Sequence, residues 1–246
     1  MSITMNDTGA RDTKGAAMHI QTIKVQRLYL QVAQQLQDLI EKGVFAPGNR
    51  LPSERDLAGQ FGVSRPTIRE AMIALEIAGA VEVRSGSGVY VLEKAGRPAQ
   101  LSDTQGPGPF EILEARRLIE GEVCALAAER ISEAQLLNLQ SLLSDMEQEN
   151  RREQATEIAD EQFHNCIAEA AGNSALGGTV AWLWQLRNES EISTLFHQRV
   201  RAEGSRPIIS DHRLILEALQ RRDPQAAREA MVNHLQRVID DLLEAK

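Results

Sequence analysis

Aromatic residues, cysteines and long apolar runs are all scarce in this chain of 246 residues. Aromatic side chains make up 4% of it, and there are two cysteines. Cys124 and Cys166 both lie in apolar helical patterns, so we expect reduced core residues rather than a disulfide framework. No apolar run reaches the length of a membrane span, and residues 1–20 lack the apolar segment of a signal peptide. The sequence therefore predicts a cytoplasmic protein.

An excess of positive charge is also absent, which bears on any binding to nucleic acid. The net charge is −8, whereas a surface that binds DNA is usually basic. The acidic excess belongs to residues 96–246, which carry 16 basic and 25 acidic residues. Residues 21–95 carry nine basic and eight acidic residues. Because charges are screened over about 8 Å at physiological salt, the distant acidic part does not exclude a locally basic face in the first part.

Length and composition favour two domains. Two domains are the natural expectation for 246 residues, and an apolar content of 42% suffices for globular cores. Residues 1–22 mix polar types without periodicity, which predicts a flexible arm. Residues 94–109 have glycine and proline on both sides of a polar stretch, which predicts a linker. The predicted domains are therefore residues 23–93 and 110–246.

Residues 51–68 carry the pattern of two short helices joined by a tight turn. Ser53 and Ser64 are typical N-cap residues, and Pro66 lies at the start of the second helix, where its missing N–H costs little. Gly62 can adopt a positive φ, which lets the second helix leave at a steep angle. This layout is that of a helix-turn-helix. The alternative, an ordinary helical hairpin in a core, does not account for the arginines that accompany the caps.

Residues 81–91 predict a β-hairpin directly after the second helix. Apolar and polar residues alternate on both sides of a Ser-Gly-Ser-Gly turn. A hairpin in this position is the wing of a winged helix-turn-helix, and its glycine-rich tip, with Gly86, lets the backbone approach a DNA groove. We expect contacts to DNA from Arg84 at the base of the wing and from four residues at the start of the recognition helix: Ser64, Arg65, Thr67 and Arg69.

This part of the chain resembles the GntR family of bacterial transcription regulators. The resemblance covers about residues 25–93 and is carried by helix, turn and wing motifs in one order: Leu51-Pro52-Ser53-Glu54-Arg55, Ser64-Arg65-Pro66-Thr67-Ile68-Arg69-Glu70-Ala71 and Gly86-Ser87-Gly88. In such proteins the residues that match Arg55, Arg65, Arg69 and Gly86 contact the operator. The resemblance implies a homodimer that places two recognition helices on a near-palindromic double-stranded DNA site.

Beyond the linker, the sequence predicts helices only. Apolar residues recur at helical spacing within residues 111–129 and again after the N-cap Ser132, with Leu118 and Leu137 assigned to buried faces. Further helices are predicted at residues 154–171, 175–188, 190–202, 207–220 and 225–244. The expected fold class is mostly α: an N-terminal winged helix-turn-helix domain and a C-terminal all-helical bundle of six or seven helices.

Three histidines and one aspartate in this bundle have the spacing of a metal site. Asp160 and His164 are four residues apart, so they share one face of a helix. His212 and His234 have apolar neighbours in their own helices, so all four side chains could project into the interior. Such ligands suit a first-row divalent metal ion. The alternative is that each histidine is an ordinary hydrogen-bonded core residue. His197 has no partner at metal spacing and is expected to be exposed.

The second domain resembles the FCD domain of the FadR subfamily, an all-helical ligand-binding module. The residues that carry the resemblance are Glu114-Ala115-Arg116 with Glu120, Asp160-Glu161-Gln162-Phe163-His164, Ala170-Ala171-Gly172-Asn173, His212 and His234. Members with this aspartate and three histidines bind a divalent metal ion, usually zinc or nickel in preparations. The resemblance implies the same role for Asp160, His164, His212 and His234, and it leaves the physiological metal open.

Arg116 and Arg187 are the arginines expected to bind an effector. The residue that matches Arg116 faces the metal cavity in the family, and a guanidinium beside a metal ion is a receptor for a carboxylate. Arg187 is a second candidate, with a surface salt bridge to Glu189 or Glu191 as the alternative. Asn173 is a third, although a helix cap would also explain it.

The whole chain is therefore expected to be a repressor controlled by a small carboxylate. Segments 109–116, 167–170, 184–187 and 230–235 are similar to hexuronate-utilisation repressors of enteric bacteria, which implies a sugar-acid effector such as glucuronate, galacturonate or fructuronate. A metal-dependent enzyme acting on a small organic acid is the alternative, but its only nearby general base, Glu161, points off the face of Asp160 and His164. A structural metal, or one that is itself the signal, also stays open. We expect no enzymatic activity and no membrane partner.

Overall fold

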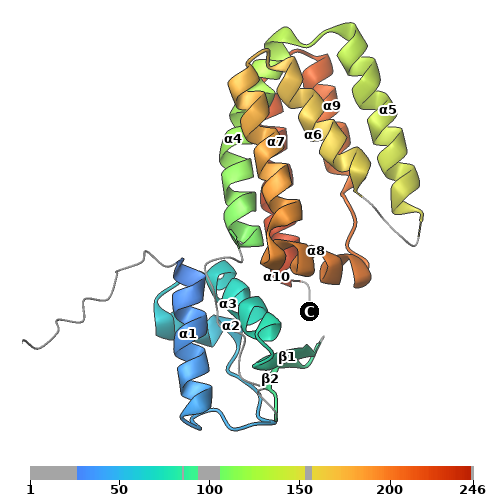
Figure 1. The fold of residues 1–246 in the computed structure, drawn as a ribbon. Helices are drawn as coiled ribbons and strands as arrows, with labels where there is room; N and C mark the ends of the chain where they lie inside the picture. Colours follow the sequence, from blue (N-terminus) through green and yellow to red (C-terminus); the bar gives the residue numbers. More distant parts are fainter. Residues whose placement is uncertain (1–26, 85, 94–105, 153–156, 245–246) are drawn as a thin grey trace, which may run out of the picture.

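The computed structural model describes residues 27–84, 86–93, 106–152 and 157–244. Figure 1 shows a small N-terminal part below a larger helical bundle. The predicted arm at residues 1–22 and most of the predicted linker at residues 94–109 lie outside the described residues. Within the described ranges, no helix combines the length and the apolar character that crossing a membrane requires.

The N-terminal part is a winged helix-turn-helix, as the sequence predicts. Its elements are α1 (Leu28–Glu41), α2 (Glu54–Phe61), α3 (Arg65–Ile77), β1 (Val81–Arg84) and β2 (Gly88–Val91). Ser53 and Ser64 cap α2 and α3 by accepting the backbone N–H three residues on. Gly62 ends α2 with φ 67°, in the left-handed region that strains other residues. The antiparallel pair β1 and β2 forms the wing directly after α3.

A core between α1 and α3 holds the recognition helix in place. Tyr29 and Leu36 of α1 are buried together with Ile68 and Leu75 of α3. Burying such a side chain stabilises the fold by about 1.5–3 kcal/mol. Because these residues occupy the inner side of α3, Ser64 and Arg65 at its start are exposed, whereas Thr67 and Arg69 are partly covered.

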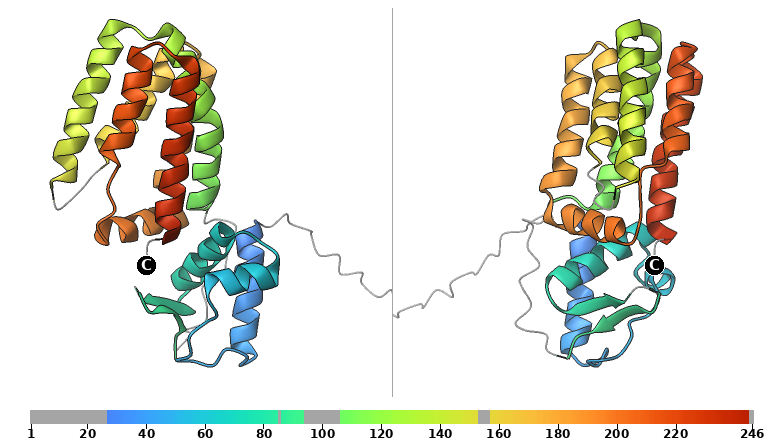
Figure 2. Two further views of the ribbon diagram at one scale, coloured as in Figure 1. Left: turned by 180° about the vertical axis from the view of Figure 1, so that it is seen from behind. Right: turned by 90° about the vertical axis from the view of Figure 1, so that its right-hand side faces the viewer.

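The C-terminal part is an all-helical bundle. Its seven helices within the described residues are α4 (Pro109–Arg130), α5 (Glu133–Asn150), α6 (Ile158–Ala170), α7 (Ser174–Glu189), α8 (Glu191–Ala202), α9 (Ile209–Gln220) and α10 (Pro224–Glu244). The helices α4 and α10 pack along each other, while α8 lies across the end of the bundle that faces the N-terminal part (Figures 1 and 2). Each predicted helix is present, and the mostly α fold class is confirmed.

Two leucines that were predicted to be buried are exposed. Leu118 of α4 is 64% exposed and Leu137 of α5 is 66% exposed. Other apolar residues of α4 and α5 are buried, so each helix has a buried face that is narrower than the predicted one. The prediction is wrong because periodicity gives the direction of the buried face, whereas the neighbouring helices decide how much of it they cover. The two cysteines, in contrast, are free and buried, as expected.

Glu70 joins the recognition helix to the start of α4. Its buried carboxylate accepts the backbone N–H groups of Phe110 at 2.9 Å and Glu111 at 3.2 Å. Gly108 permits this approach, since a Cβ at that position would overlap the Glu70 carboxylate. Burial, and next the charge of Glu111, raise the pKa of Glu70 to about 8. A buried acceptor thus caps the first turn of α4 from the other part of the molecule.

We expect Glu70→Gln to change how the stability of the protein depends on pH. Because the pKa rises from 4.5 to about 8 on folding, the folded state binds more protons between those values and its stability falls as the pH rises. Glutamine keeps an acceptor oxygen without this titration. Urea unfolding at pH 6 and pH 8 should show the wild-type protein losing more stability than the variant, by up to about 1.4 kcal/mol per pH unit.

The matched control is Glu122→Gln, which alters an exposed glutamate whose pKa is lowered by its hydrogen bond with Arg228. This group stays ionised over the whole pH interval, so its removal should leave the pH dependence unchanged. If the unfolding free energies of the wild-type protein and Glu70→Gln changed equally between pH 6 and pH 8, the raised pKa of Glu70 would be contradicted.

Candidate functional site

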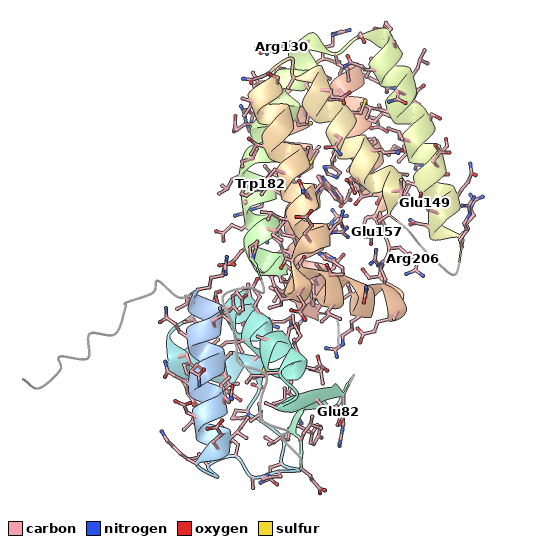
Figure 3. All side chains as sticks on the ribbon, viewed as in Figure 1. Glu82, Arg130, Glu149, Glu157, Trp182 and Arg206 are labelled. Carbon is pink, nitrogen blue, oxygen red and sulfur yellow. The ribbon has the colours of Figure 1, made fainter. Side chains whose placement is uncertain are left out.

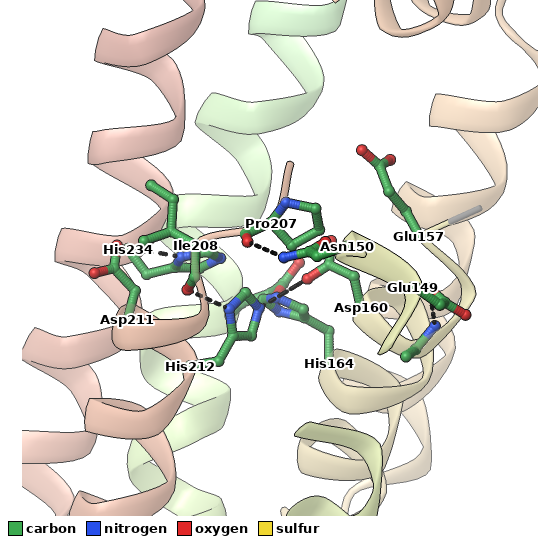
Figure 4. Close-up of polar contacts among 12 residues, drawn as sticks. Glu149, Asn150, Glu157, Asp160, His164, Pro207, Ile208, Asp211, His212 and His234 are labelled. Carbon is green, nitrogen blue, oxygen red and sulfur yellow. Dashed lines mark hydrogen bonds and ion pairs between the residues drawn. The ribbon is translucent and has the colours of Figure 1, made fainter. Parts of the chain in front are cut away.

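Asp160, His164, His212 and His234 come together inside the bundle (Figure 4). Asp160 and His164 lie one turn apart on α6, His212 lies on α9 and His234 on α10. One candidate ligand atom from each residue lies within 4.8 Å of the other three, and all three histidines are buried. The structure therefore brings the whole predicted set to one place, which we call the four-residue cluster.

Glu120 holds His164 from outside this cluster. One oxygen of this buried carboxylate contacts His164 Nδ1, and the other accepts a hydrogen bond of 2.6 Å from Arg116 Nε. Burial raises the pKa of Glu120, but the charges of Arg116 and His164 outweigh it and lower the pKa to about 2. A carboxylate on Nδ1 orients the imidazole and makes Nε2 a better metal ligand. Glu120 is among the residues that carry the FCD resemblance, but the sequence does not indicate its contact with His164, 44 positions away.

His212 also has a partner on Nδ1, the ring nitrogen that faces away from the cluster. His212 Nδ1 lies 2.9 Å from the backbone oxygen of Ile208, and its Nε2 lies 2.8 Å from Asp160 Oδ1. His234 Nδ1 lies 3.6 Å from an oxygen of Asp211, which is too long for a hydrogen bond, and it has no hydrogen-bond partner among the described residues. The contact with Ile208 orients the His212 ring so that Nε2 faces the cluster.

The donor set fits a divalent metal ion. His164 Nε2 is buried and has no hydrogen-bond partner among the described residues, so it is available as a ligand. Burial raises the pKa of Asp160, but the hydrogen bond with His212 and the histidine charges hold it well below its usual range. Burial, and next the charge of His212, lower the pKa of His234 to about 4. Burial lowers the pKa of His212, but the hydrogen bond with Asp160 outweighs it and raises this pKa. A metal ion binds the ionised carboxylate and neutral imidazoles, so it would displace a proton from His212 where that residue is charged.

A small cavity of about 70 Å³ opens beside the cluster. The residues that line it include Asp160, His234, Arg116, Arg187 and His197. The guanidinium carbon of Arg116 lies 3.9 Å from the ring centroid of Trp184, and its Nη2 has no hydrogen-bond partner among the described residues. Arg116 therefore lies between Glu120 and Trp184 beside the cavity, with one donor still available for a ligand.

Arg187 is buried against an internal carboxylate. It is 8% exposed and its Nη2 contacts Glu157, so the alternative of a surface salt bridge with Glu189 or Glu191 is wrong. Glu157 has φ 54°, a conformation that costs energy in a residue other than glycine, and it lies 3.6 Å from Arg201 as well. The guanidinium that was expected to receive an effector carboxylate thus holds a carboxylate of the chain itself.

Two residues differ from their predicted roles. His197, expected to be exposed, is 7% exposed and its Nδ1 lies 3.5 Å from Arg187 Nη2. The prediction is wrong because α8 crosses the end of the bundle, which covers its inner face. Asn173 accepts the N–H groups of Ala175 and Leu176 as the N-cap of α7, and it does not line the cavity. The helix cap therefore explains Asn173, and we do not assign it to the effector.

The residues expected to contact DNA lie on one surface of the N-terminal part. Five of them line a common hollow: Arg55, Arg65, Arg69, Arg84 and Gly86. The other two, Ser64 and Thr67, join their hydroxyl groups at 2.8 Å in the first turn of α3. The fold therefore gathers the start of the recognition helix, α2 and the wing into one basic face.

Comparisons with known proteins cover both parts of the chain. Residues 28–91 match the family described as bacterial regulatory proteins, gntR family, and residues 111–237 match the FCD domain. The chain is 36% identical over 225 residues to the Uxu operon regulator of Haemophilus influenzae, covering 89% of this chain and 84% of that protein. It is 38% identical over 216 residues to the Exu regulon transcriptional regulator of Escherichia coli K12, covering 85% and 82%.

A solved structure described as Streptococcus agalactiae GntR is 29% identical to this chain and has a TM-score of 0.44 to it. The match covers 85% of this chain and 98% of that one. The matched proteins are regulators rather than enzymes. They therefore disfavour the metal-dependent enzyme.

We expect Zn²⁺ to stabilise the protein through the four-residue cluster. After removal of metal with a chelator, added Zn²⁺ should raise the melting midpoint, because a ligand at a hundred times its dissociation constant stabilises the folded state by about 2.7 kcal/mol. His212→Ala removes one ligand and should abolish the shift. His197→Ala removes a buried imidazole outside the cluster and should keep it. A shift of equal size in both variants would place the metal elsewhere.

Proposed function

Because this chain belongs to the GntR family of bacterial regulatory proteins and carries an FCD domain, we propose that it is a repressor whose operator binding is controlled by a sugar acid. The effector would bind at a metal ion in the bundle. The observation that carries this proposal is the contact of Arg187 with Glu157, which puts a carboxylate beside the four-residue cluster. Relatives described as Uxu and Exu regulators favour a hexuronate.

The metal ion would be held by Asp160, His164, His212 and His234. When bound, it would offer positively charged coordination positions to oxygen atoms of the effector. Glu120 would keep His164 oriented from behind. Zinc and nickel both suit these ligands, and the donor set does not select one of them.

Arg116 and Arg187 would bind the carboxylate of the effector. A guanidinium can hold a carboxylate through two parallel hydrogen bonds, which no other side chain offers in the same geometry. The cavity of about 70 Å³ is much smaller than a usual ligand pocket of about 300–1,000 Å³. The effector must therefore displace Glu157 from Arg187, so that one carboxylate replaces another. Glucuronate, galacturonate and fructuronate all have one carboxylate for this exchange and hydroxyl oxygens for the metal.

We also propose a homodimer on a near-palindromic operator. Leu118 of α4 is 64% exposed and Trp182 of α7, labelled in Figure 3, is 55% exposed. The helices α4 and α7 pack against each other. Large exposed apolar side chains on adjacent helices favour a protein interface. Two copies would then place two recognition helices in successive major grooves. The DNA contacts would come from Arg55, Ser64, Arg65, Thr67, Arg69, Arg84 and Gly86.

We expect one hexuronate to bind the metal-loaded protein and to depend on Arg187. Calorimetric titration with glucuronate, galacturonate and fructuronate should detect binding that a chelator abolishes. Arg187→Gln should weaken it at least tenfold, because a charge-assisted pair contributes about 1.5–3 kcal/mol. The variant should still show the Zn²⁺ shift, which separates the effector from the metal.

The matched control for this titration is Arg213→Gln, which removes an exposed arginine paired with Glu147 at 3.0 Å. It should bind the effector like the wild-type protein. Equal affinity in Arg187→Gln, or binding that survives the chelator, would rule out the proposed site.

We expect Arg55→Ala to weaken DNA binding and its dependence on salt. With a 30-base-pair duplex that the protein selects from a random library, losing one phosphate contact should reduce the slope of log affinity against log salt by about one. Arg222→Ala, which removes an exposed arginine beside Glu133 at 3.4 Å, should leave the slope unchanged. An unaltered slope in Arg55→Ala would remove Arg55 from the DNA-binding set.

A further inference from the structure

The basic face of the N-terminal part does not point into open solvent. It lines a hollow of about 640 Å³ whose opposite wall belongs to the bundle. That wall consists of Phe196, Arg199 and Val200 of α8, of Glu203 directly after α8, and of Leu242, Leu243 and Glu244 of α10. In Figure 2, α8 and the end of α10 lie directly above the N-terminal part. We call this space the interdomain hollow.

The last turn of α10 occupies two of the arginines expected to contact DNA. Arg65 Nη2 donates to the backbone oxygen of Leu243 at 3.2 Å, and Arg69 Nη1 donates to that of Leu242. Carbonyl groups in the last turn of a helix have no N–H partner within it, and they carry the negative end of the helix dipole. For a guanidinium they present the same kind of acceptor as a phosphate or a guanine edge.

Two acidic side chains of the N-terminal part also pair with arginines at this contact, one within that part and one across to the bundle. Glu54 accepts two hydrogen bonds from Arg69, at 2.7 and 3.0 Å, and lies 3.8 Å from Arg65. Glu76 near the end of α3 pairs with Arg199 of α8, and both side chains are partly buried. The helix α3 is therefore held against the bundle near both of its ends.

This arrangement excludes DNA from α3. A recognition helix must lie inside a major groove about 12 Å wide and 8.5 Å deep, with phosphates on both sides. Here α8 and α10 already contact the side of α3 that carries its arginines. Binding to an operator requires the two parts to separate.

We propose that this is an autoinhibited form, in which the last turn of α10 competes with DNA for Arg65 and Arg69. The same helix carries His234 of the four-residue cluster. Val200 and Leu242 line both the interdomain hollow and the cavity beside that cluster. In this proposal, a displacement of the residues that line the cavity reaches Arg65 and Arg69 through α10 and through the side chains of Val200 and Leu242. The proposal rests on DNA binding by the N-terminal part and on neither the metal nor the effector.

Opening the closed form should strengthen DNA binding. The apparent dissociation constant is the intrinsic one divided by the open fraction. Arg199→Glu replaces the ion pair with Glu76 by a repulsion, and neither residue belongs to the proposed DNA-contacting set. We expect about fivefold tighter binding, measured by fluorescence anisotropy with the selected duplex and with a random-sequence duplex. A general electrostatic effect has the opposite sign, since the variant is more acidic.

Arg213→Glu is the matched control. It makes the same change of charge on α9, in an exposed pair with Glu147, and it does not line the interdomain hollow. Its affinity for both duplexes should equal that of the wild-type protein or be slightly weaker.

A second experiment traps the closed form. Glu76→Cys and Arg199→Cys place one thiol on each side of the hollow, while Cys124 and Cys166 are buried. A bifunctional maleimide should join the new thiols within one chain, which the mass of the denatured product verifies. We expect the uncrosslinked double variant to bind DNA more tightly than the wild-type protein, and the crosslinked one to bind at least tenfold more weakly than its uncrosslinked form.

The proposal is overturned if Arg199→Glu binds no more tightly than Arg213→Glu, or if crosslinking leaves the affinity unchanged. Absence of DNA binding in the wild-type protein and in every variant would instead overturn the DNA-binding assignment, and this proposal with it. The Zn²⁺ shift and the hexuronate titration do not depend on either result.

Discussion

The burial of three imidazoles and one carboxylate between α6, α9 and α10 is the constraint on which the rest of the structure depends. Polar groups in a core destabilise the fold unless they are paired. Glu120 contacts Nδ1 of His164, and the backbone oxygen of Ile208 contacts Nδ1 of His212. Asp160 contacts Nε2 of His212. The bundle closes around this polar centre, and the helices that supply it cannot slide without separating those partners. An ion at the cluster would tie the same helices together more firmly.

Two helices connect this centre to the recognition helix. The helix α4 carries Glu120, and its first turn is capped by Glu70 of α3. The helix α10 carries His234, and its last turn meets Arg69 of α3. Both helices therefore contact the surroundings of the cluster in one part and α3 in the other. Glu157, held in a strained conformation on Arg187, stands where an effector would begin a displacement of these helices.

Most of the fold is predictable because its signals are local. The caps Ser53 and Ser64 and the turn at Gly62 set the angle between α2 and α3 through contacts within a few residues. Helical periodicity likewise locates the helices of the bundle. It fails for Leu118, which no neighbouring helix covers, and for His197, which the oblique course of α8 buries. Both depend on where other helices lie, and that information is absent from the local pattern.

In the candidate site, too, local spacing is predictable from the sequence and contacts between distant residues are not. The sequence by itself determined that Asp160 and His164 share a face, since a helix repeats every 3.6 residues, and the same spacing joins Arg116 to Glu120. Only the tertiary structure decided that Glu157 lies on Arg187, 30 positions away, and that the end of α10 lies on Arg65, 178 positions away. The physical reason is that local geometry fixes the face a side chain occupies, whereas the packing of whole helices decides which faces meet.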